Sequence, residues 1–435
     1  MHDDLLARHR TVLPSWLALS YEHPISLVSG SGCHVVDAEG NRYLDFFGGI
    51  LTTMCGYDVP EVVDAIRTQA GRMLHTSTLY LIEPMIELAE KISGLSTIPD
   101  AKVFFTTSGT EANKAALLMA SSYRRSNQVL ALRNSYHGRS FATMGITGNR
   151  GWSPSSLSPF VVHYVQNGYR FRSPFAHLDD AGFIAAVVDD LRDVLVTCTA
   201  GDVAAMVIEP IQGVGGFTVP PDGMWGAVQQ VLREYGILYV SDEVQTGWGR
   251  TGDHFWGYQA HSVEPDLVTF AKGVGNGLPV AGVIGRPELM DCVTGNSIST
   301  FGGNPLVSAG ALANLQYLLD HDLQANAAKQ GKRIRAVLEP LVDRFDAVGE
   351  VRGRGLMIGV ELVEADGRTP SPALATRVME GTRAAGLLIG KGGLFGNCLR
   401  IAPPLSVSAE EATRGAEVVV QVVADAVGAV AAAPA

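Results

Sequence analysis

The sequence predicts an α/β protein built on a mostly parallel sheet with helices on both faces, together with a second, smaller α/β unit. Short apolar runs of strand-forming residues alternate with helical stretches from about residue 101 onward, a pattern typical of strands joined by right-handed helical crossovers. These runs are apolar almost throughout, as expected where both faces of a sheet are buried. The expected strands of the main sheet are residues 103–106, 129–132, 204–208, 237–241, 267–271 and 280–284.

The composition is that of an ordinary folded protein, long enough at 435 residues for two domains. Apolar residues make up 46% of the chain and charged residues 18%, and no stretch resembles a disordered tail. The net charge of −11 argues against nucleic acid and anionic membranes as partners, because no basic surplus is available to neutralise phosphates. No window reaches the roughly 18 uninterrupted apolar residues of a membrane span, so we expect neither a nucleic acid nor a membrane as partner.

The cysteines and the first residues predict a cytoplasmic protein. The five cysteines are scattered and lack metal-ligand spacing, so we expect reduced thiols and no metal site. The first eight residues are too acidic, and their apolar run is too short, for a secretory signal.

Two elements are predicted before the main sheet. Residues 34–50 place Glu39, Gly40 and Asn41 between two short extended runs, which is typical of a β-hairpin. Pro60 then begins a helical pattern with its apolar residues on one face.

The remaining elements are less regular at first and then form the second unit. Prolines interrupt residues 150–200, where we expect an irregular excursion with a helix near 180–195. Asn304 and Pro305 predict the N-cap and first position of a long helix. Strands at 355–362, 387–389 and 398–402, with a last helix opening at the capping box Ser408–Glu411, predict the smaller unit. If the hairpin pairs with it, residues 59–310 form a large domain, and 1–58 with 311–435 form a discontinuous small domain.

Charged residues end two neighbouring strands of the main sheet, at the edge where open α/β sheets bind ligands. Asp242 ends one of these strands and Lys272 follows the other. Burying either charge is costly unless something pairs with it. Asp242 could hold a protonated ring nitrogen, and a desolvated Lys272 could form a Schiff base with an aldehyde; pyridoxal phosphate requires both. The alternative is a solvated lysine and a capping aspartate.

A phosphate site is predicted where the first strand of the sheet ends. Ser108, Gly109 and Thr110 lead from that strand into a helix. Free N–H groups and the helix dipole attract anions at such a junction, and the two hydroxyls can add donors. An ordinary helix cap is the alternative.

Two other strand ends, and the residues that directly follow Asp242, could contribute to the same site. Tyr136 or His137 could stack against a planar ring, with core packing as the alternative. Val244 could pack on one face of that ring while Gln245 bonds to its hydroxyl. Glu209 is a further carboxylate at a buried strand end, which could instead pair with a structural arginine or a backbone amide.

Six motifs, in order, resemble the class III (ω-amino acid) aminotransferases of the fold-type I pyridoxal phosphate family. The resemblance covers nearly all of the chain, from residue 43 to residue 405, and six motifs in register are far more specific than one. The motifs are SGTEAN at 108–113, YHG at 136–138, IEPIQG at 208–213, SDEVQTGWGRTG at 241–252, AKG at 271–273 and TFGGNP at 300–305.

The resemblance implies how this chain would hold the cofactor pyridoxal 5'-phosphate. Lys272 would be the Schiff-base lysine and the proton carrier, and Asp242 would keep the pyridine nitrogen protonated. The loop 108–110 would hold the phosphate, with Thr300 contributing from a neighbouring subunit. Tyr136, Val244 and Gln245 would contact the ring, and His137 and Glu209 would belong to the same site. A homodimer or a dimer of dimers is implied, because the family shares its sites between subunits.

The substrate residues follow from the same resemblance. Arg400 matches the arginine that binds the substrate α-carboxylate with its planar fork, although a structural ion pair is the alternative. Arg139 matches the residue that grips a distal carboxylate in 4-aminobutyrate aminotransferases, and Ile50 matches a pocket residue there.

Two departures bear on the substrate. Val214 stands where 4-aminobutyrate and ornithine aminotransferases carry a glutamate that neutralises the carboxylate-binding arginine. Without that glutamate Arg400 stays available in both half-reactions, which favours amino and oxo partners that each present a nearby carboxylate. The motifs HFWGYQ at 254–259, KGVGNG at 272–277 and GKGG at 390–393 are closer to the alanine–glyoxylate and 3-aminoisobutyrate–pyruvate branch, whereas Arg139 is shared with the other branch.

These features predict an aminotransferase that moves an amino group from a β- or ω-amino acid or alanine to pyruvate or glyoxylate. The mechanism would be ping-pong, with the cofactor alternating between its pyridoxal and pyridoxamine forms. The alternatives are a transfer from 4-aminobutyrate or a related ω-amino acid to 2-oxoglutarate, a decarboxylase or epimerase of the same family, and a noncatalytic relative.

Overall fold

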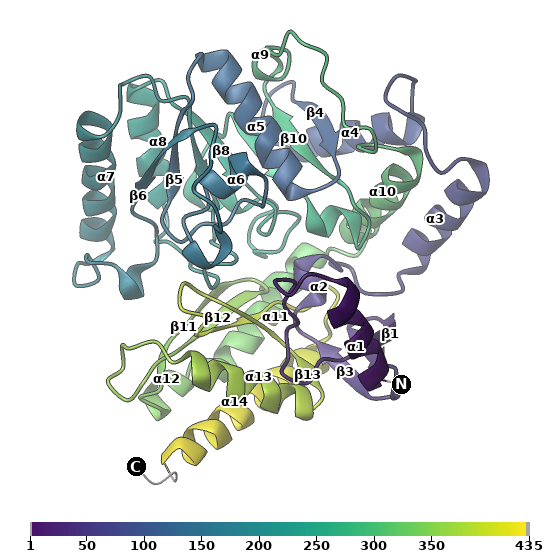
Figure 1. Ribbon diagram of the computed structural model, residues 1–435, viewed down its shortest axis with the longest axis vertical. Helices are drawn as coiled ribbons and strands as arrows, with labels where there is room; N and C mark the ends of the chain where they lie inside the picture. The colour runs from purple at the N-terminus through teal and green to yellow at the C-terminus, as the bar shows by residue number, and fades with distance from the viewer. Residues whose placement is uncertain (1, 432–435) are drawn as a thin grey trace.

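The structure is a computed structural model that describes residues 2–431. It has an upper part in Figure 1 that contains the elements from α3 to α10, and a lower part in which the N-terminal strands lie beside the C-terminal elements. Chain segments far apart in sequence therefore form the lower part together, and the fold is α/β as predicted.

The main sheet has seven strands in the order β4-β10-β9-β8-β7-β5-β6. Neighbouring strands are parallel except where β10 pairs with β4 and with β9, so the prediction of a mostly parallel sheet is confirmed. The strands are β4 (Lys102–Thr106), β5 (Gln128–Leu132), β6 (Val161–Val165), β7 (Ala205–Ile208), β8 (Leu238–Asp242), β9 (Leu267–Phe270) and β10 (Ala281–Gly285).

The edge strand β6 is an element that the sequence did not predict. It lies in the stretch expected to be irregular, and it pairs only with β5. Its residues VVHYV include His163 and begin with the half-exposed Val161, so they lack the continuous apolar run of the central strands. The helix expected near 180–195 is present as α7 (Asp180–Thr197).

Helices cover both faces of the main sheet, as a parallel sheet requires. On one face α5 (Gly109–Arg124) packs its alanines against Val240 and Val283. On the other face α7 and α8 (Met224–Glu234) pack against the larger side chains Met206 and Tyr239. The other helices of this part are α3 (Pro60–Arg72), α4 (Glu83–Leu95), α6 (Phe141–Gly145), α9 (Pro287–Met290) and α10 (Pro305–Asp320).

Two four-stranded sheets make up the lower part. One has the order β1-β2-β3-β13 and joins the N-terminal hairpin to the C-terminal unit, with Leu44 paired to Leu387 in parallel. The other has the order β11-β12-β15-β14 and carries Arg400 on β15. The strands are β1 (Leu27–Ser31), β2 (His34–Asp37), β3 (Arg42–Asp45), β11 (Val348–Arg354), β12 (Met357–Leu362), β13 (Leu387–Leu388), β14 (Gly390–Gly392) and β15 (Cys398–Ile401). The expected pairing of the hairpin with this unit is present, and the domain limits of 59–310 and 1–58 with 311–435 stay a prediction.

The predicted helix starts in the second half of the chain are confirmed. The side chain of Asn304 accepts a hydrogen bond from the backbone N–H of Val307 at the start of α10. Ser408 and Glu411 exchange the two bonds of a capping box before the last helix. Helices of the lower part are α1 (His2–Val12), α2 (Gly48–Leu51), α11 (Leu323–Leu338), α12 (Leu341–Arg344), α13 (Pro372–Ala384) and α14 (Ala409–Ala431). Within residues 2–431, no helix is both long and apolar enough to cross a bilayer.

Candidate active site

A cavity of about 220 Å³ lies at the carboxyl ends of β4, β5, β7, β8 and β9. Side chains far apart in the sequence meet there because parallel strands end at the same edge of a sheet. The lining includes predicted cofactor residues from every one of these strand ends: Ser108, Gly109, Thr110, Tyr136, His137, Glu209, Asp242, Val244, Gln245 and Lys272, with Arg139 beside them.

Asp242 is held in a buried hydrogen-bond network. One carboxylate oxygen lies 2.7 Å from His137 Nδ1 and accepts a hydrogen bond of 2.7 Å from the amide of Asn113. The other oxygen accepts from the backbone N–H of Val244. Burial opposes a charge on His137, but the hydrogen bond to Asp242 and the nearby carboxylates outweigh it and raise the pKa of the imidazole. Asp242 is therefore fixed in direction by three hydrogen-bond partners.

Lys272 follows β9 and has a φ of 50°, a backbone conformation that residues other than glycine rarely adopt. Such outliers persist only where the surrounding structure imposes them, and they concentrate at functional sites. Burial, together with the positive charge of Arg400, lowers the pKa of its ammonium to about 8, against the opposing charges of Asp242 and Glu209. With a pKa of about 8, roughly a tenth of this amine is neutral at pH 7, far more than for an ordinary lysine, which suits a nucleophile or a proton acceptor.

Glu209 ties two strand-end loops together. Its two carboxylate oxygens accept hydrogen bonds of 2.8 Å from the backbone N–H groups of Tyr136 and Gly213. Burial raises its pKa to about 7, with Asp242 adding to the effect and His137 opposing it. The alternative that Glu209 pairs with backbone amides is therefore observed, and the residue also lines the cavity.

The loop from Ser108 to Thr110 forms the N-terminus of α5, as predicted. Ser108 is the N-cap, and its hydroxyl accepts from the backbone N–H of Glu111 at 3.4 Å. The hydroxyl of Thr110 accepts from the backbone N–H groups of Arg139 and Ser140 and bonds to Thr143. Since Thr110 already has these partners, the N–H groups of the first helical turn are the donors best placed for an anion.

Two glycines of the lining leave no room for a side chain. A Cβ atom added to Gly109 would come within 3.2 Å of both methyl groups of Val244, and one added to Gly138 would lie 2.5 Å from Thr110. The backbone therefore approaches the cavity closely on this side. A carboxylate, a lysine of lowered pKa and a helix N-terminus around one cavity are the groups that pyridoxal phosphate requires, so the residues present fit that cofactor.

Arg400 lies beside the cavity but does not line it in the part of the chain that the structure describes. Its guanidinium is buried between the rings of Phe47 and Phe217, with centroid distances of 5.2 and 4.6 Å. Its Nη2 donates a hydrogen bond of 2.8 Å to Oε1 of Gln245. Burial lowers its pKa to about 10, so Arg400 is charged at neutral pH. The alternative of a structural ion pair is not observed, because no salt bridge to Arg400 is found among residues 2–431.

Of the other predicted residues, Thr300 and Ile50 lie outside the cavity, and Arg139 belongs to its lining. Thr300 is exposed, and no hydrogen bond of its side chain is found within residues 2–431, so its role from a neighbouring subunit stays a prediction. Ile50 is half exposed, with φ of 66°. Arg139 lies at the mouth of the cavity, where its guanidinium is 5.1 Å from the ring centroid of Trp16.

Sequence reasoning missed three residues of this region. Asn113 donates a hydrogen bond to Asp242 and accepts one from the hydroxyl of Thr269, both at 2.7 Å. A polar residue among the alanines on the buried face of a helix could have indicated its role. Phe47 and Phe217 enclose Arg400 from distant segments, and no local pattern indicates that contact.

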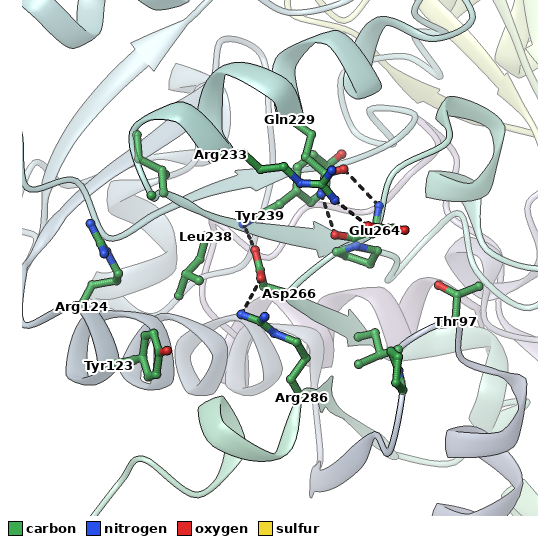
Figure 2. Close-up of a pocket in the computed structure, with 15 residues that line it drawn as sticks. Thr97, Tyr123, Arg124, Gln229, Arg233, Leu238, Tyr239, Glu264, Asp266 and Arg286 are labelled. Carbon is green, nitrogen blue, oxygen red and sulfur yellow. Dashed lines mark hydrogen bonds and ion pairs between the residues drawn. The ribbon is translucent and has the colours of Figure 1, made fainter.

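A larger cavity of about 560 Å³ lies at the opposite ends of the strands, beside the starts of β8 and β9 (Figure 2). Two of its arginines are neutralised, since Arg233 pairs with Glu264 at 2.6 Å and Arg286 with Asp266 at 2.8 Å. None of the predicted site residues lines it. The candidate site is therefore identified by the predicted residues that meet at the smaller cavity and not by the size of the cavity.

Comparisons with known proteins point to one family. A family model described as aminotransferase class-III matches residues 18–423. The mitochondrial alanine–glyoxylate aminotransferase 2 homolog 2 of Arabidopsis thaliana is 39% identical over 414 residues, covering 94% of this chain and 85% of that protein. The 4-aminobutyrate aminotransferase of Mycobacterium leprae is 34% identical, covering 92% and 91%. The structure of an (S)-enantioselective omega-transaminase from Thermomicrobium roseum superimposes with a TM-score of 0.89, at 33% identity and 98% coverage of both chains.

Proposed function

The chain belongs to the class-III aminotransferases and is a pyridoxal phosphate-dependent transaminase, and on that premise we propose that it transfers the amino group of a β- or ω-amino acid or alanine to pyruvate or glyoxylate. The observation that carries the substrate class is the pairing of Arg400 with the neutral Gln245 rather than with a carboxylate. The similarity to an alanine–glyoxylate aminotransferase supports the same choice.

Lys272 and Asp242 perform the work common to the family in this proposal. When bound, the cofactor supplies an aldehyde that exchanges for an amine and a ring that withdraws electrons from the substrate Cα. Lys272, with its pKa lowered to about 8, would take the proton from that Cα and return it to C4′, the aldehyde carbon of the cofactor. Asp242, fixed by Asn113 and His137, holds the positive charge on the ring nitrogen.

The remaining cofactor residues would provide binding and orientation. The N–H groups at the start of α5, with the hydroxyl of Ser108, bind the phosphate. Tyr136 and Val244 cover the two faces of the ring, and Gln245 lies near its hydroxyl. Support comes from the position of all these residues around one cavity.

The substrate carboxylate binds Arg400 in both half-reactions. In 4-aminobutyrate and ornithine aminotransferases, a glutamate at the position of Val214 would neutralise the arginine when the ω-amine of the substrate is bound. Here the position is Val214, whose backbone carbonyl instead accepts from the N–H of Gly393. Two partners that each carry a carboxylate near the reacting carbon, such as alanine and glyoxylate, satisfy Arg400 equally.

The 4-aminobutyrate:2-oxoglutarate reaction is the second candidate, favoured by Arg139 at the mouth of the cavity. Its guanidinium could bind a distal carboxylate there, with Ile50 as a wall of the same pocket. The similarity to a mycobacterial 4-aminobutyrate aminotransferase points the same way.

A homodimer, or a dimer of dimers, completes the proposal. Thr300 would reach the phosphate of the neighbouring site, which requires its segment to lie in an interface. Large apolar side chains are exposed beside it and in another loop: Ile298 and Phe301, with Leu79, Tyr80 and Leu81. Large apolar side chains exposed in this number are typical of a segment that lies in an interface. The same proposal places the enzyme in the cytoplasm, since its five cysteines are free.

A matched screen of substrates tests the proposal. Each amino donor is assayed against pyruvate, glyoxylate and 2-oxoglutarate with equal enzyme, and the Lys272→Ala protein is the control. We expect the two small oxo acids to give the highest kcat/KM. A clear preference for 2-oxoglutarate would instead establish the second candidate, and carbon dioxide or inverted amino acid formed without any oxo acid would establish a decarboxylase or epimerase.

A further inference from the structure

The edge of Arg400 that would bind a carboxylate is only half satisfied. A side-on carboxylate takes two parallel hydrogen bonds from an arginine, one from Nε and one from the neighbouring Nη. In this structure Nη2 donates to Gln245 Oε1 at 2.8 Å, whereas Nε is buried without a hydrogen-bond partner among the described residues. Unpaired buried donors are uncommon and costly, so this edge is prepared for a second acceptor.

Gln245 separates this edge from the cavity. Gln245 lines the cavity and Arg400 does not, although the two side chains are in direct contact. Arg400 is also fixed from other directions, because the rings of Phe47 and Phe217 flank its guanidinium and a Cβ on Gly392 would lie 2.6 Å from its Cδ. A carboxylate that enters from the cavity therefore meets the amide of Gln245 before it meets the arginine.

The position of that amide depends on a glycine in the preceding loop. A Cβ on Gly213 would fall 2.3 Å from the amide carbon and nitrogen of Gln245. Gly213 itself is anchored by the bond from its N–H to Glu209. Because Gly213 has no side chain, the loop leaves the space in which Gln245 contacts Arg400. Gly213 directly precedes the uncharged Val214.

We propose that Gln245 is a neutral gate on the Arg400 carboxylate site: its amide oxygen occupies the position of one carboxylate oxygen and must leave Nη2 when substrate binds. The substrate then takes Nη2 and the unsatisfied Nε together. The inference rests on the proposed function, in which Arg400 binds the substrate carboxylate, and it makes Gln245 a specificity residue. A substrate carboxylate can displace the neutral amide of Gln245 easily. When the bound end of a substrate has no carboxylate, Gln245 cannot neutralise the charge of Arg400.

The gate is tested by the affinity of the holoenzyme for propanoate, which has a carboxylate but neither an amino nor an oxo group and so cannot react. Isothermal titration calorimetry gives the dissociation constant without any turnover. Removal of the competing acceptor in Gln245→Ala should tighten propanoate binding, by about tenfold if the lost competitor equals one hydrogen bond to a charged group. A charged competitor in Gln245→Glu should weaken it by about tenfold or more, because its carboxylate would form a buried ion pair with Arg400 that propanoate would have to break.

A second variant displaces the amide of Gln245 without a change to Gln245 itself. Gly213→Ala should displace the amide of Gln245 from Arg400 and so tighten propanoate binding, as Gln245→Ala does. If Gln245 only supports the cofactor, both substitutions leave propanoate affinity unchanged or weaken it, and that result would overturn the gate.

Arg400→Ala separates this inference from the proposed function. Loss of propanoate binding in that variant, together with tighter binding in Gln245→Ala, supports both. Loss of binding in Arg400→Ala without tighter binding in Gln245→Ala leaves the carboxylate site in place and refutes the gate. Unchanged binding in Arg400→Ala would refute the assignment of the carboxylate to Arg400, and the gate with it.

Discussion

The lowered pKa of Lys272 gives a prediction that can be worked out numerically. An ordinary lysine with a pKa of 10.5 is neutral to about 0.03% at pH 7, whereas a pKa of about 8 leaves about 9% neutral. Because the neutral amine is the nucleophile, Lys272 should bond to pyridoxal phosphate about 300-fold faster at pH 7 than an unperturbed lysine of equal intrinsic reactivity.

The assay follows the absorbance change as apoenzyme is mixed with pyridoxal phosphate between pH 6 and about 10. Under the same conditions a simple alkylamine corrects for titration of the cofactor itself, and Lys272→Ala gives the background. We expect the corrected rate to rise with pH and level off with a midpoint near 8. The sign follows from deprotonation, since a lower pKa shifts the reactive form to lower pH.

The cause of the shift can be tested separately with Arg400→Met. Burial lowers the pKa of Lys272, and the charge of Arg400 lowers it further. Methionine keeps most of the apolar stem and removes the charge, so the midpoint should move upward. A wild-type rate that still rises steeply at about pH 10, with no midpoint near 8, would refute the assignment of Lys272 to a desolvated site. An unchanged midpoint in the variant would refute the contribution of Arg400.

Three further substitutions test the site and the fold. Asn113→Ala removes a 2.7 Å hydrogen bond to the buried aspartate, and the dissociation constant of the cofactor should rise by at least about tenfold, the worth of a bond to a charged group; an unchanged constant would contradict the positioning role. In Gly138→Ala, whose new Cβ would lie 2.5 Å from a neighbouring threonine, cofactor affinity should fall, whereas Gly201→Ala, which has a positive φ but open space, should bind cofactor like wild type. Asn304→Ala loses the N-cap of α10 and should lower the free energy of unfolding in urea by about 1 kcal/mol.

Much of the fold could be predicted because the central strands are buried on both faces. Their apolar runs are local signals, and Asp242 and Lys272 are conspicuous at the ends of such runs. The edge strand β6 has a mixed pattern of exposed and buried residues, and for that reason the sequence predicts an irregular segment there. The antiparallel direction of β10 is set by its neighbours β4 and β9, and nothing within its own residues encodes it.

The cofactor side of the site was more accessible to sequence reasoning than the substrate side. Each strand end brings its residues to the same edge, so knowledge of the strands places Glu209 and Tyr136 near Asp242. Arg400 is different, because its contacts with Phe47, Phe217 and Gln245 join segments that are far apart in the chain. The sequence assigned Gln245 to the cofactor, and only the three-dimensional arrangement shows its contact with the arginine.

The central claim is that this chain moves amino groups through a cofactor bound at Lys272 and Asp242. Its most direct test is the visible absorbance of the reconstituted protein during one half-reaction at a time. Alanine alone should convert the pyridoxal form of the wild type to the pyridoxamine form with release of one pyruvate per site, glyoxylate should then reverse the change, and Lys272→Ala should do neither at a comparable rate. A wild-type protein that stays colourless after reconstitution, or whose spectrum responds to no amino acid, would contradict the account.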